Sequence, residues 1–373
     1  MHLPSLIRRR LLASAAAAAL ATPAWAQRGS PVLVAQLFDT SPREQDVAKD
    51  FLNGSRAAWQ EINAQGGLRG RQVVHQPVEV DGANPESLRQ AWRALKDNNA
   101  CVALSGTASD PLASQLTALL AQENAGIAHA APWLQNSSQE IGDATFPIFA
   151  GRREQIEHAL KSLSVMGIAE VGAVYAAPRD FALQRDDVTR IAADFKLKLS
   201  DFQAHGDLAR LGQRLGPNSP ALLLFMGGTP ELLQFTQGLQ RQARQRYVIA
   251  LADVNLQTLQ QMGGGKSTPI IATQAVPMAT AALPVVRRYR DAMARLFDEP
   301  PAALSLAGYI AARYTYEVLA GVDGQLTRAS ALSEFRRRAE VDLGGYRVRF
   351  DASRRSTTFV TQSMLTADGR VVG

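Results

Sequence analysis

Short apolar runs alternate along this chain with segments of helical periodicity, and this alternation limits the possible folds more than any other feature. Residues 32–38 (VLVAQLF) form the first run, and Val47, Phe51, Ala58 and Ile62 then recur at helical spacing. Strands that alternate with helices are typical of parallel sheets with crossover helices. The sequence therefore predicts an α/β fold.

The same alternation continues to the end of the chain. Strands are predicted at 71–81, 101–106, 127–132, 170–175, 221–228, 247–253, 268–276, 345–351 and 357–365. Helices are predicted at 85–98, 111–126, 153–167, 230–242, 282–297, 303–321 and 327–338. The chain has 373 residues, of which 46% are hydrophobic, so it can bury more than one core. Its length and the restart of the pattern after residue 150 predict two α/β layers.

The segment 62–71 (INAQGGLRGR) separates the first helical pattern from the second strand. Gly66 and Gly67 can take left-handed backbone conformations that residues with a Cβ avoid, which ends a helix and reverses the chain. We interpret the segment as a structural turn whose two arginines are solvated, rather than as a ligand contact.

The N-terminal segment reads as an export signal. Arginines precede an apolar stretch at 11–21, and an A-x-A cleavage pattern follows at 24–26. The stretch is shorter than the roughly 20 residues that span a membrane. We therefore expect export to the periplasm with cleavage after Ala26. Arg8 and Arg9 leave two routes open, the twin-arginine pathway and the general secretory pathway.

Charge and cysteine content exclude several classes of site. The chain carries a formal charge of +6, but its first 26 residues contain three arginines and no acidic residue. Half of the net positive charge thus lies in the predicted signal. Because the rest of the chain is only weakly basic, we expect no nucleic-acid partner. Cys101 is the single cysteine, which excludes an intramolecular disulfide or a multi-cysteine metal site. It begins an apolar run and is predicted to be a buried strand thiol.

Catalytic and cofactor motifs are missing. The segment 262–268 (MGGGKST) resembles the end of a phosphate loop. The first glycine of the phosphate-loop pattern is missing, because Gln260 occupies its position. The chain has no G-x-G-x-x-G after a strand, no G-x-S-x-G around a serine and no paired histidine ligands. We predict a protein that is not an enzyme, with no catalytic residue, no cofactor and no bound metal.

The loop 105–109 (SGTAS) follows a predicted strand and precedes a helix. Thr107 and Ser109 offer hydroxyl groups, and the N–H groups at a helix start favour an anion such as a carboxylate. Ser109 can equally be a helix N-cap without a ligand, so both interpretations stay open. His129, at the end of the next strand, is either a structural residue or a ligand contact.

Residues 53–71 (NGSRAAWQEINAQGGLRGR), a strand ending in Asp81 and residues 84–106 carry a resemblance to a known family. They resemble the periplasmic solute-binding proteins of the branched-chain amino-acid (Leu/Ile/Val-binding) type. The similarity is dense over 31–135 and continues in element order to the end of the chain. It implies the type I periplasmic binding fold, in which two Rossmann-like lobes with parallel sheets flanked by helices are joined by three crossovers.

The resemblance implies the following division of the chain. The signal peptide comprises 1–26, the N-terminal lobe 27–150 plus 277–344, and the C-terminal lobe 151–276 plus 345–373.

It also implies a function without chemistry. A monomer in the periplasm would capture a small polar ligand, an amino acid or a related carboxylate, between its lobes. It would then deliver the ligand to the membrane permease of an ABC importer. The alternative is a periplasmic ligand-sensing module for a receptor or kinase, and the genes beside this one would separate the two.

In the family, loops after the strand ends of both lobes build the ligand site. By this resemblance Ala130 and Ala131 lie where Ala or Ser precedes a Thr that holds the α-groups of an amino acid, although Pro132 takes the place of Thr. Trp133 is then the main apolar wall of the cleft.

The second lobe contributes three further candidates by the same resemblance. Phe181 lies where the family commonly has tyrosine, and Thr229 lies where an aromatic residue can occur. Asp253 lies near the acid that accepts an ammonium group. Together with Thr107 and Ser109, these residues form the predicted ligand site.

The signal assignment predicts that protein from the exported fraction of its native host begins at Gln27, because the A-x-A pattern directs cleavage after residue 26. Intact-mass spectrometry measures this directly. An exported protein that retains residues 1–26 would refute the assignment. Replacing both Arg8 and Arg9 by lysine should stop export only if the twin-arginine route is used.

Overall fold

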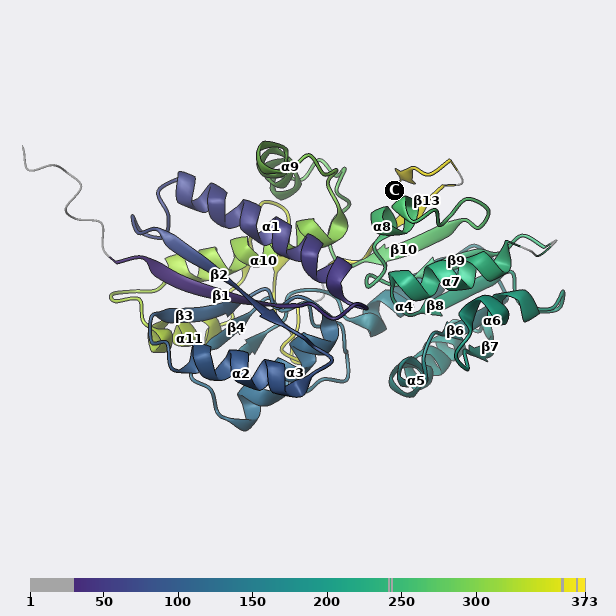
Figure 1. Ribbon diagram of the computed structural model, residues 1–373, viewed down its shortest axis with the longest axis horizontal. Helices are drawn as coiled ribbons and strands as arrows, with labels where there is room; N and C mark the ends of the chain where they lie inside the picture. The colour runs from purple at the N-terminus through teal and green to yellow at the C-terminus, as the bar shows by residue number, and fades with distance from the viewer. Residues whose placement is uncertain (1–29, 241, 243, 357–358, 367, 373) are drawn as a thin grey trace, which may run out of the picture.

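The computed structural model describes residues 30–240, 242, 244–356, 359–366 and 368–372. The predicted signal peptide and its cleavage site lie outside these residues. Figure 1 shows two α/β lobes side by side, each built around its own sheet. Within the described ranges, no helix is long and apolar enough to cross a membrane.

The first lobe is built on a parallel five-stranded sheet with the order β2-β1-β3-β4-β5. Its strands are β1 (Val32–Asp39), β2 (Val73–Val80), β3 (Cys101–Ser105), β4 (Ala128–Ala130) and β5 (Thr145–Phe146). Cys101 is fully buried in β3, which confirms the prediction of a buried strand thiol.

Helices cover both faces of this sheet (Figure 1). One face packs on α1 (Gln45–Ala64), α10 (Ala303–Ala320) and α11 (Arg328–Arg336), with α9 (Pro284–Leu296) lying against α1. The other face packs on α2 (Pro85–Lys96) and α3 (Asp110–Gln122). Because both faces are covered, the central strands are apolar throughout, which is why they stand out in the sequence.

The second lobe is built on a seven-stranded sheet with the order β14-β13-β10-β9-β8-β6-β7. Its parallel strands are β6 (Glu170–Tyr175), β7 (Lys198–Gln203), β8 (Leu222–Met226), β9 (Tyr247–Ala250) and β10 (Ile270–Gln274). At one edge β13 (Thr361–Leu365) and β14 (Val371–Val372) are antiparallel. One face is covered by α4 (Arg152–Val165) and α5 (Pro178–Asp194), and the other by α6 (Leu208–Arg214), α7 (Thr229–Leu239) and α8 (Leu256–Gln261).

The structure adds to the elements that the sequence predicted the helices α5, α6 and α8 and the strands β5, β7, β11 (Val341–Asp342) and β14. It also replaces the strand predicted at 345–351 by the short strand β12 (Arg347–Val348), which pairs with β11. Tyr346 and Val348 are fully buried in the core of the first lobe. This part of the chain therefore belongs to the first lobe, because its apolar side chains find their core there.

The chain passes between the sheets after β5, after β10 and after β12. At the third passage the N–H of Ser356 still donates to the Pro147 carbonyl at 3.2 Å, so the passage lies beyond Ser356 rather than near residue 345. We propose lobes of 30–150 with 277–356, and of 151–276 with 359–372.

The glycine turn acts as the sequence predicts. Helix α1 ends at Ala64, and Gly66 and Gly67 have φ values of 107° and 71°. Arg69 is exposed, as expected of a solvated arginine, and Arg71 is half-buried, but both also donate to backbone carbonyls. Arg69 Nη1 lies 2.7 Å from the Val322 oxygen, and Arg71 Nε lies 2.7 Å from the Ser30 oxygen. The turn is thus also hydrogen-bonded to the segment before β1 and to the loop after α10.

Helices α1 and α10 cross at two glycines. A Cβ at Gly54 would overlap the Ser305 carbonyl, and a Cβ at Gly308 would overlap the Phe51 carbonyl. At this crossing Ser55 Oγ donates to the Gly308 carbonyl at 3.1 Å. The two backbones approach this closely only because neither glycine has a side chain.

We expect Gly54→Ala to lower the free energy of unfolding by about 2–3 kcal/mol, because the added methyl group forces the two helices apart. Gly126→Ala is the matched control, since Gly126 is exposed and its added Cβ meets no atom within 4 Å. Urea unfolding followed by circular dichroism measures both variants. Equal stability of the two variants would contradict the close helix crossing.

Candidate functional site

The strand ends of both lobes meet at the cleft, and most predicted site residues lie there. Thr107 and Ser109 follow β3, Trp133 follows β4, and Asp253 follows β9. Helix α3 begins immediately after Ser109. The parallel strands direct these loops to one edge of each sheet, which is where ligands bind in open α/β sheets.

Ser109 and Thr107 are fully buried, and their hydroxyl groups already have protein partners. Ser109 Oγ donates to Asp39 Oδ2 at 2.7 Å and accepts from the Leu112 N–H at 3.3 Å, as an N-cap of α3. Thr107 Oγ1 lies 2.9 Å from His129 Nε2. Burial lowers the pKa of His129 to about 3, so this imidazole is neutral. Both hydroxyls stabilise the loop in this conformation.

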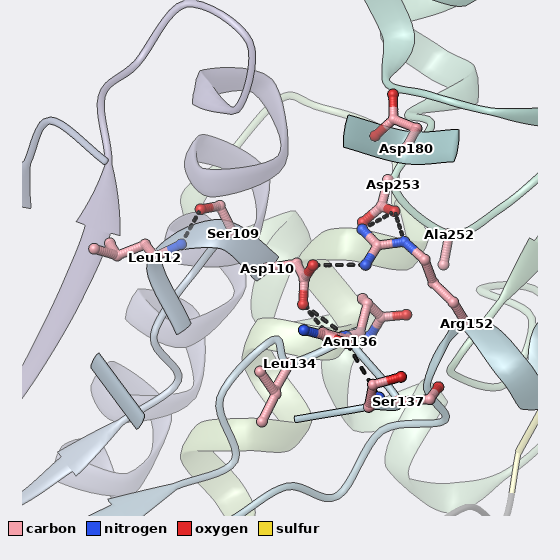
Figure 2. A network of polar contacts seen from close by, with 12 residues as sticks. Ser109, Asp110, Leu112, Leu134, Asn136, Ser137, Arg152, Asp180, Ala252 and Asp253 are labelled. Carbon is pink, nitrogen blue, oxygen red and sulfur yellow. Dashed lines mark hydrogen bonds and ion pairs between the residues drawn. The ribbon is translucent and has the colours of Figure 1, made fainter. Parts of the chain in front are cut away.

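Arg152 occupies the space between the loops. Its Nη1 lies 2.6 Å from Asp110 Oδ2, and its Nη2 and Nε lie 2.7 Å and 3.1 Å from Asp253 Oδ2 (Figure 2). Asp110 begins α3 in the first lobe, whereas Asp253 follows β9 in the second. One guanidinium group therefore joins the two lobes across the cleft.

The other oxygen of Asp110 orders the loop after β4. Its Oδ1 accepts from the N–H groups of Gln135 at 2.7 Å and Asn136 at 2.8 Å (Figure 2). The Asp110 side chain is only 4% exposed, and that of Arg152 is 16% exposed. Burial lowers the pKa of Arg152, but the negative charges of Asp110 and Asp253 raise it by more. The net shift is upward, so the guanidinium stays charged. Because these groups are buried, each carboxylate is stabilised in its charged form by the guanidinium rather than by water.

Two further polar links cross the cleft. Arg43, between β1 and α1, places its Nη2 3.1 Å from Asp180 Oδ2 and its Nε 3.1 Å from Glu231 Oε1. Asn255 Nδ2 donates to Asp50 Oδ2 at 2.8 Å. In each link one residue belongs to the first lobe and its partner belongs to the second. These side chains therefore link the two lobes across the cleft.

The free space beside Asp253 is small. It measures about 30 Å³, room for about two water molecules, and is bordered by Arg43, Glu44, Arg152, Asp180, Gln184, Met226, Gly227, Gly228, Leu251 and Asp253. The guanidinium of Arg152 thus holds the position beside Asp253 that the sequence assigned to a ligand ammonium group. Arg152 contacts only the Oδ2 atom of Asp253, so a ligand amine that approached this carboxylate would lie beside the positive charge of the guanidinium.

The loop after β4 forms an apolar wall. Ala130 and Ala131 are fully buried, and Ala131 has a φ of 47°, which turns the chain toward Trp133. The Trp133 indole is 1% exposed and packs against Phe149, with ring centroids 5.2 Å apart. Trp133 also borders a cavity of about 340 Å³ that residues of both lobes line. Of the predicted site residues, Trp133 has the largest space beside it.

Phe181 and Thr229 contact other residues of the second lobe. The Phe181 ring lies edge-to-face on Tyr175 at 5.0 Å and packs against the core of the second lobe. Thr229 begins α7 and accepts from the Asn255 N–H at 2.9 Å. Both side chains have protein partners that position loops of the second lobe.

Arg43, Asp110 and Arg152 were not among the site residues predicted from the sequence. Asp110 follows Ser109 directly, and Arg152 begins a helix next to the predicted crossover near residue 150. Those positions were the available signal, because charged residues at a crossover face the other lobe. The pairing partners come from distant parts of the chain. Among the described residues, no cluster of His, Cys, Asp and Glu could hold a metal ion.

Glu44 makes the stability of this cleft depend on pH. Burial raises the pKa of Glu44 to about 8, and the nearby Asp253 adds to the rise. A carboxyl group whose pKa is raised by folding stabilises the protein fully below its ordinary pKa of about 4.5, and this stabilisation is lost as the pH rises through 8. We expect Glu44→Gln, which stays neutral, to remove this loss.

Urea unfolding at pH 5 and pH 8.5 tests the assignment. Wild type and Glu44→Gln should be similarly stable at pH 5, and the variant should be more stable at pH 8.5 by on the order of 1–4 kcal/mol. A difference between the two proteins that is the same at both pH values would refute it.

The fold of this chain is similar to that of several solved ligand-binding and substrate-binding proteins. An extracellular ligand-binding receptor from Verminephrobacter eiseniae shares 18% identity, with a TM-score of 0.82 over 92% of this chain and 100% of that chain. A fatty acid ABC transporter substrate-binding protein from Thermomonospora curvata shares 14% identity, with a TM-score of 0.77 over 91% of this chain and 90% of that one.

The branched-chain amino acid transporter substrate binding protein LivJ from Streptococcus pneumoniae, in complex with isoleucine, shares 14% identity, with a TM-score of 0.74 over 91% of this chain and 97% of that one. Among curated proteins, no sequence matches this chain.

The fold that the sequence predicts is confirmed by these structures, which share its two α/β lobes. The family and the similar structures consist of solute-binding proteins, so the chain is a binding protein and not an enzyme. A family model described as periplasmic binding protein matches residues 31–367, and the chain therefore belongs to the periplasmic binding protein family.

Proposed function

We propose that this protein captures a small solute between its two lobes in the periplasm and delivers it to the membrane permease of an ABC importer. The observation that carries the proposal is the bridge from Asp110 through Arg152 to Asp253, which holds the lobes closed around a cavity lined by both. Closure of two lobes gives a permease a distinct shape to recognise.

The similar structures support this role. Two of them are named as substrate-binding proteins of ABC or amino acid transporters, and their named ligands, a fatty acid and isoleucine, are chemically different. The fold is thus compatible with several ligand classes. The ligand of this chain has to be argued from its own cleft.

The sequence predicted an amino acid or a related carboxylate as the ligand. Asp253, the proposed ammonium acceptor, is paired with Arg152 at 2.7 Å, and the space beside it is about 30 Å³. An amino acid would place its ammonium group either in the position of Arg152 or beside this positive charge, and both arrangements are unfavourable. We therefore favour a solute without a free amine in place of the predicted amino acid.

We expect wild-type protein to bind solutes without an amine more tightly than the corresponding amino acids. Arg152→Met should shift the ratio of the two affinities toward the amino acids by about tenfold or more, because Asp253 then becomes available to an ammonium group. Thermal-shift screening of a metabolite library identifies the pairs of solutes, and calorimetry measures them.

Arg43→Met is the matched control, since Arg43 also links the lobes but does not pair with Asp253. The control should leave the preference against amines unchanged. If wild type binds an amino acid best and Asp253→Asn abolishes that binding, the original amino-acid assignment is right and our preference for a ligand without an amine is wrong.

A further inference from the structure

The 340 Å³ cavity beside Trp133 lies at the junction of the lobes and rests against the second passage of the chain. Trp133 and Leu304 border it from the first lobe, Leu256 borders it from α8 of the second, and Val276 and Met278 border it from the passage after β10. Its walls move apart when the lobes open, so a molecule inside it is enclosed only in the closed form.

No described residue that lines this cavity carries a charged side chain. Its polar lining consists of amide and hydroxyl groups and one indole. A second groove of about 600 Å³, beside α1, differs because it is lined by Asp39, Asp46, Lys49, Asp50, Arg56 and Glu299 among others. A charged molecule in the Trp133 cavity would lose its hydration without gaining a counter-charge, which is costly. The lining therefore favours an uncharged occupant.

Two polar atoms of the cavity-lining residues lack a hydrogen-bond partner within the described part of the chain. They are the donor Trp133 Nε1 and the acceptor Gln274 Oε1, and the two residues are 1% and 9% exposed. A buried polar group without a partner destabilises a protein, and most such groups in folded proteins are satisfied. Both atoms are shielded from the cavity in this conformation, so a bound molecule with one acceptor and one donor satisfies both only when the two side chains turn toward it.

We propose that the Trp133 cavity binds an uncharged, largely apolar small molecule whose acceptor pairs with Trp133 and whose donor pairs with Gln274, as an amide group on an apolar body does. This inference rests on the proposed function and names the class of the captured solute. It places the solute apart from the charged pair at Asp253, whose carboxylate is already paired.

Three probes of similar size test the class. Benzamide is uncharged and carries both a carbonyl acceptor and an amide donor, benzoate is an anion, and benzylamine is a cation. Calorimetry at neutral pH should show saturable binding of benzamide and at least about tenfold weaker binding of each charged probe. Tighter binding of either charged probe, or no binding of benzamide, would overturn the proposal.

Two variants locate the binding site. Trp133→Phe and Gln274→Met remove one hydrogen-bonding atom each and retain an apolar side chain of comparable shape. Each should weaken benzamide binding by about three- to tenfold. Trp59→Phe is the matched control, because Trp59 also has a buried Nε1 without a partner but does not border this cavity. Its affinity for benzamide should equal that of wild type.

Thermal melts accompany the titrations, so a loss of binding is assigned to the cavity only in a variant that is folded. Unchanged benzamide affinity in both cavity variants would overturn the site. Solute capture fails in a different way: wild type would then show no saturable binding to any member of the metabolite library, whatever benzamide does.

Discussion

The closed form of this protein depends on one guanidinium group. Arg152 begins the helix that follows the first passage between the lobes, and it pairs with Asp110 of the first lobe and Asp253 of the second. Removing Arg152 leaves two buried carboxylates without their shared cation, whereas removing either aspartate leaves one ion pair intact. Asp110 also holds the loop that carries Trp133, through the N–H groups of Gln135 and Asn136. Closure and the shape of the apolar wall are therefore coupled through one carboxylate.

This arrangement divides the interface into regions of different chemistry. Around Arg43 and Arg152 the charges are paired with each other and leave little free space, so this region joins the lobes. Beside Trp133 the lining is uncharged and the space is larger. A solute that fills the second region adds apolar contacts to both lobes without disturbing the ion pairs of the first. Its binding then favours the closed form, because the open form offers it fewer contacts.

The sequence was sufficient for the fold and for the edge of the sheets where the cleft lies. Buried parallel strands are continuous apolar runs, and the glycine turn at Gly66 and Gly67 ended α1 as expected. It was not sufficient for β7, an edge strand whose residues are all exposed or only partly buried and which therefore shows no apolar run. Nor could it show the partners of Ser109 and Asp253, since the distances that join Asp39 to Ser109 and Arg152 to Asp253 arise only when segments far apart in the chain pack together. The hydroxyl of Ser109 and the carboxylate of Asp253, which the sequence predicted to bind a ligand, both contact other residues of the protein.

The most direct test of this account is a crystal structure of the protein with the solute that the metabolite screen identifies. The account predicts a chemically unchanged solute that is enclosed by both lobes and contacts Trp133 on one side and α8 on the other, with Arg152 still paired to Asp110 and Asp253. A solute that contacts one lobe only, or that displaces Arg152 from Asp253, would contradict it.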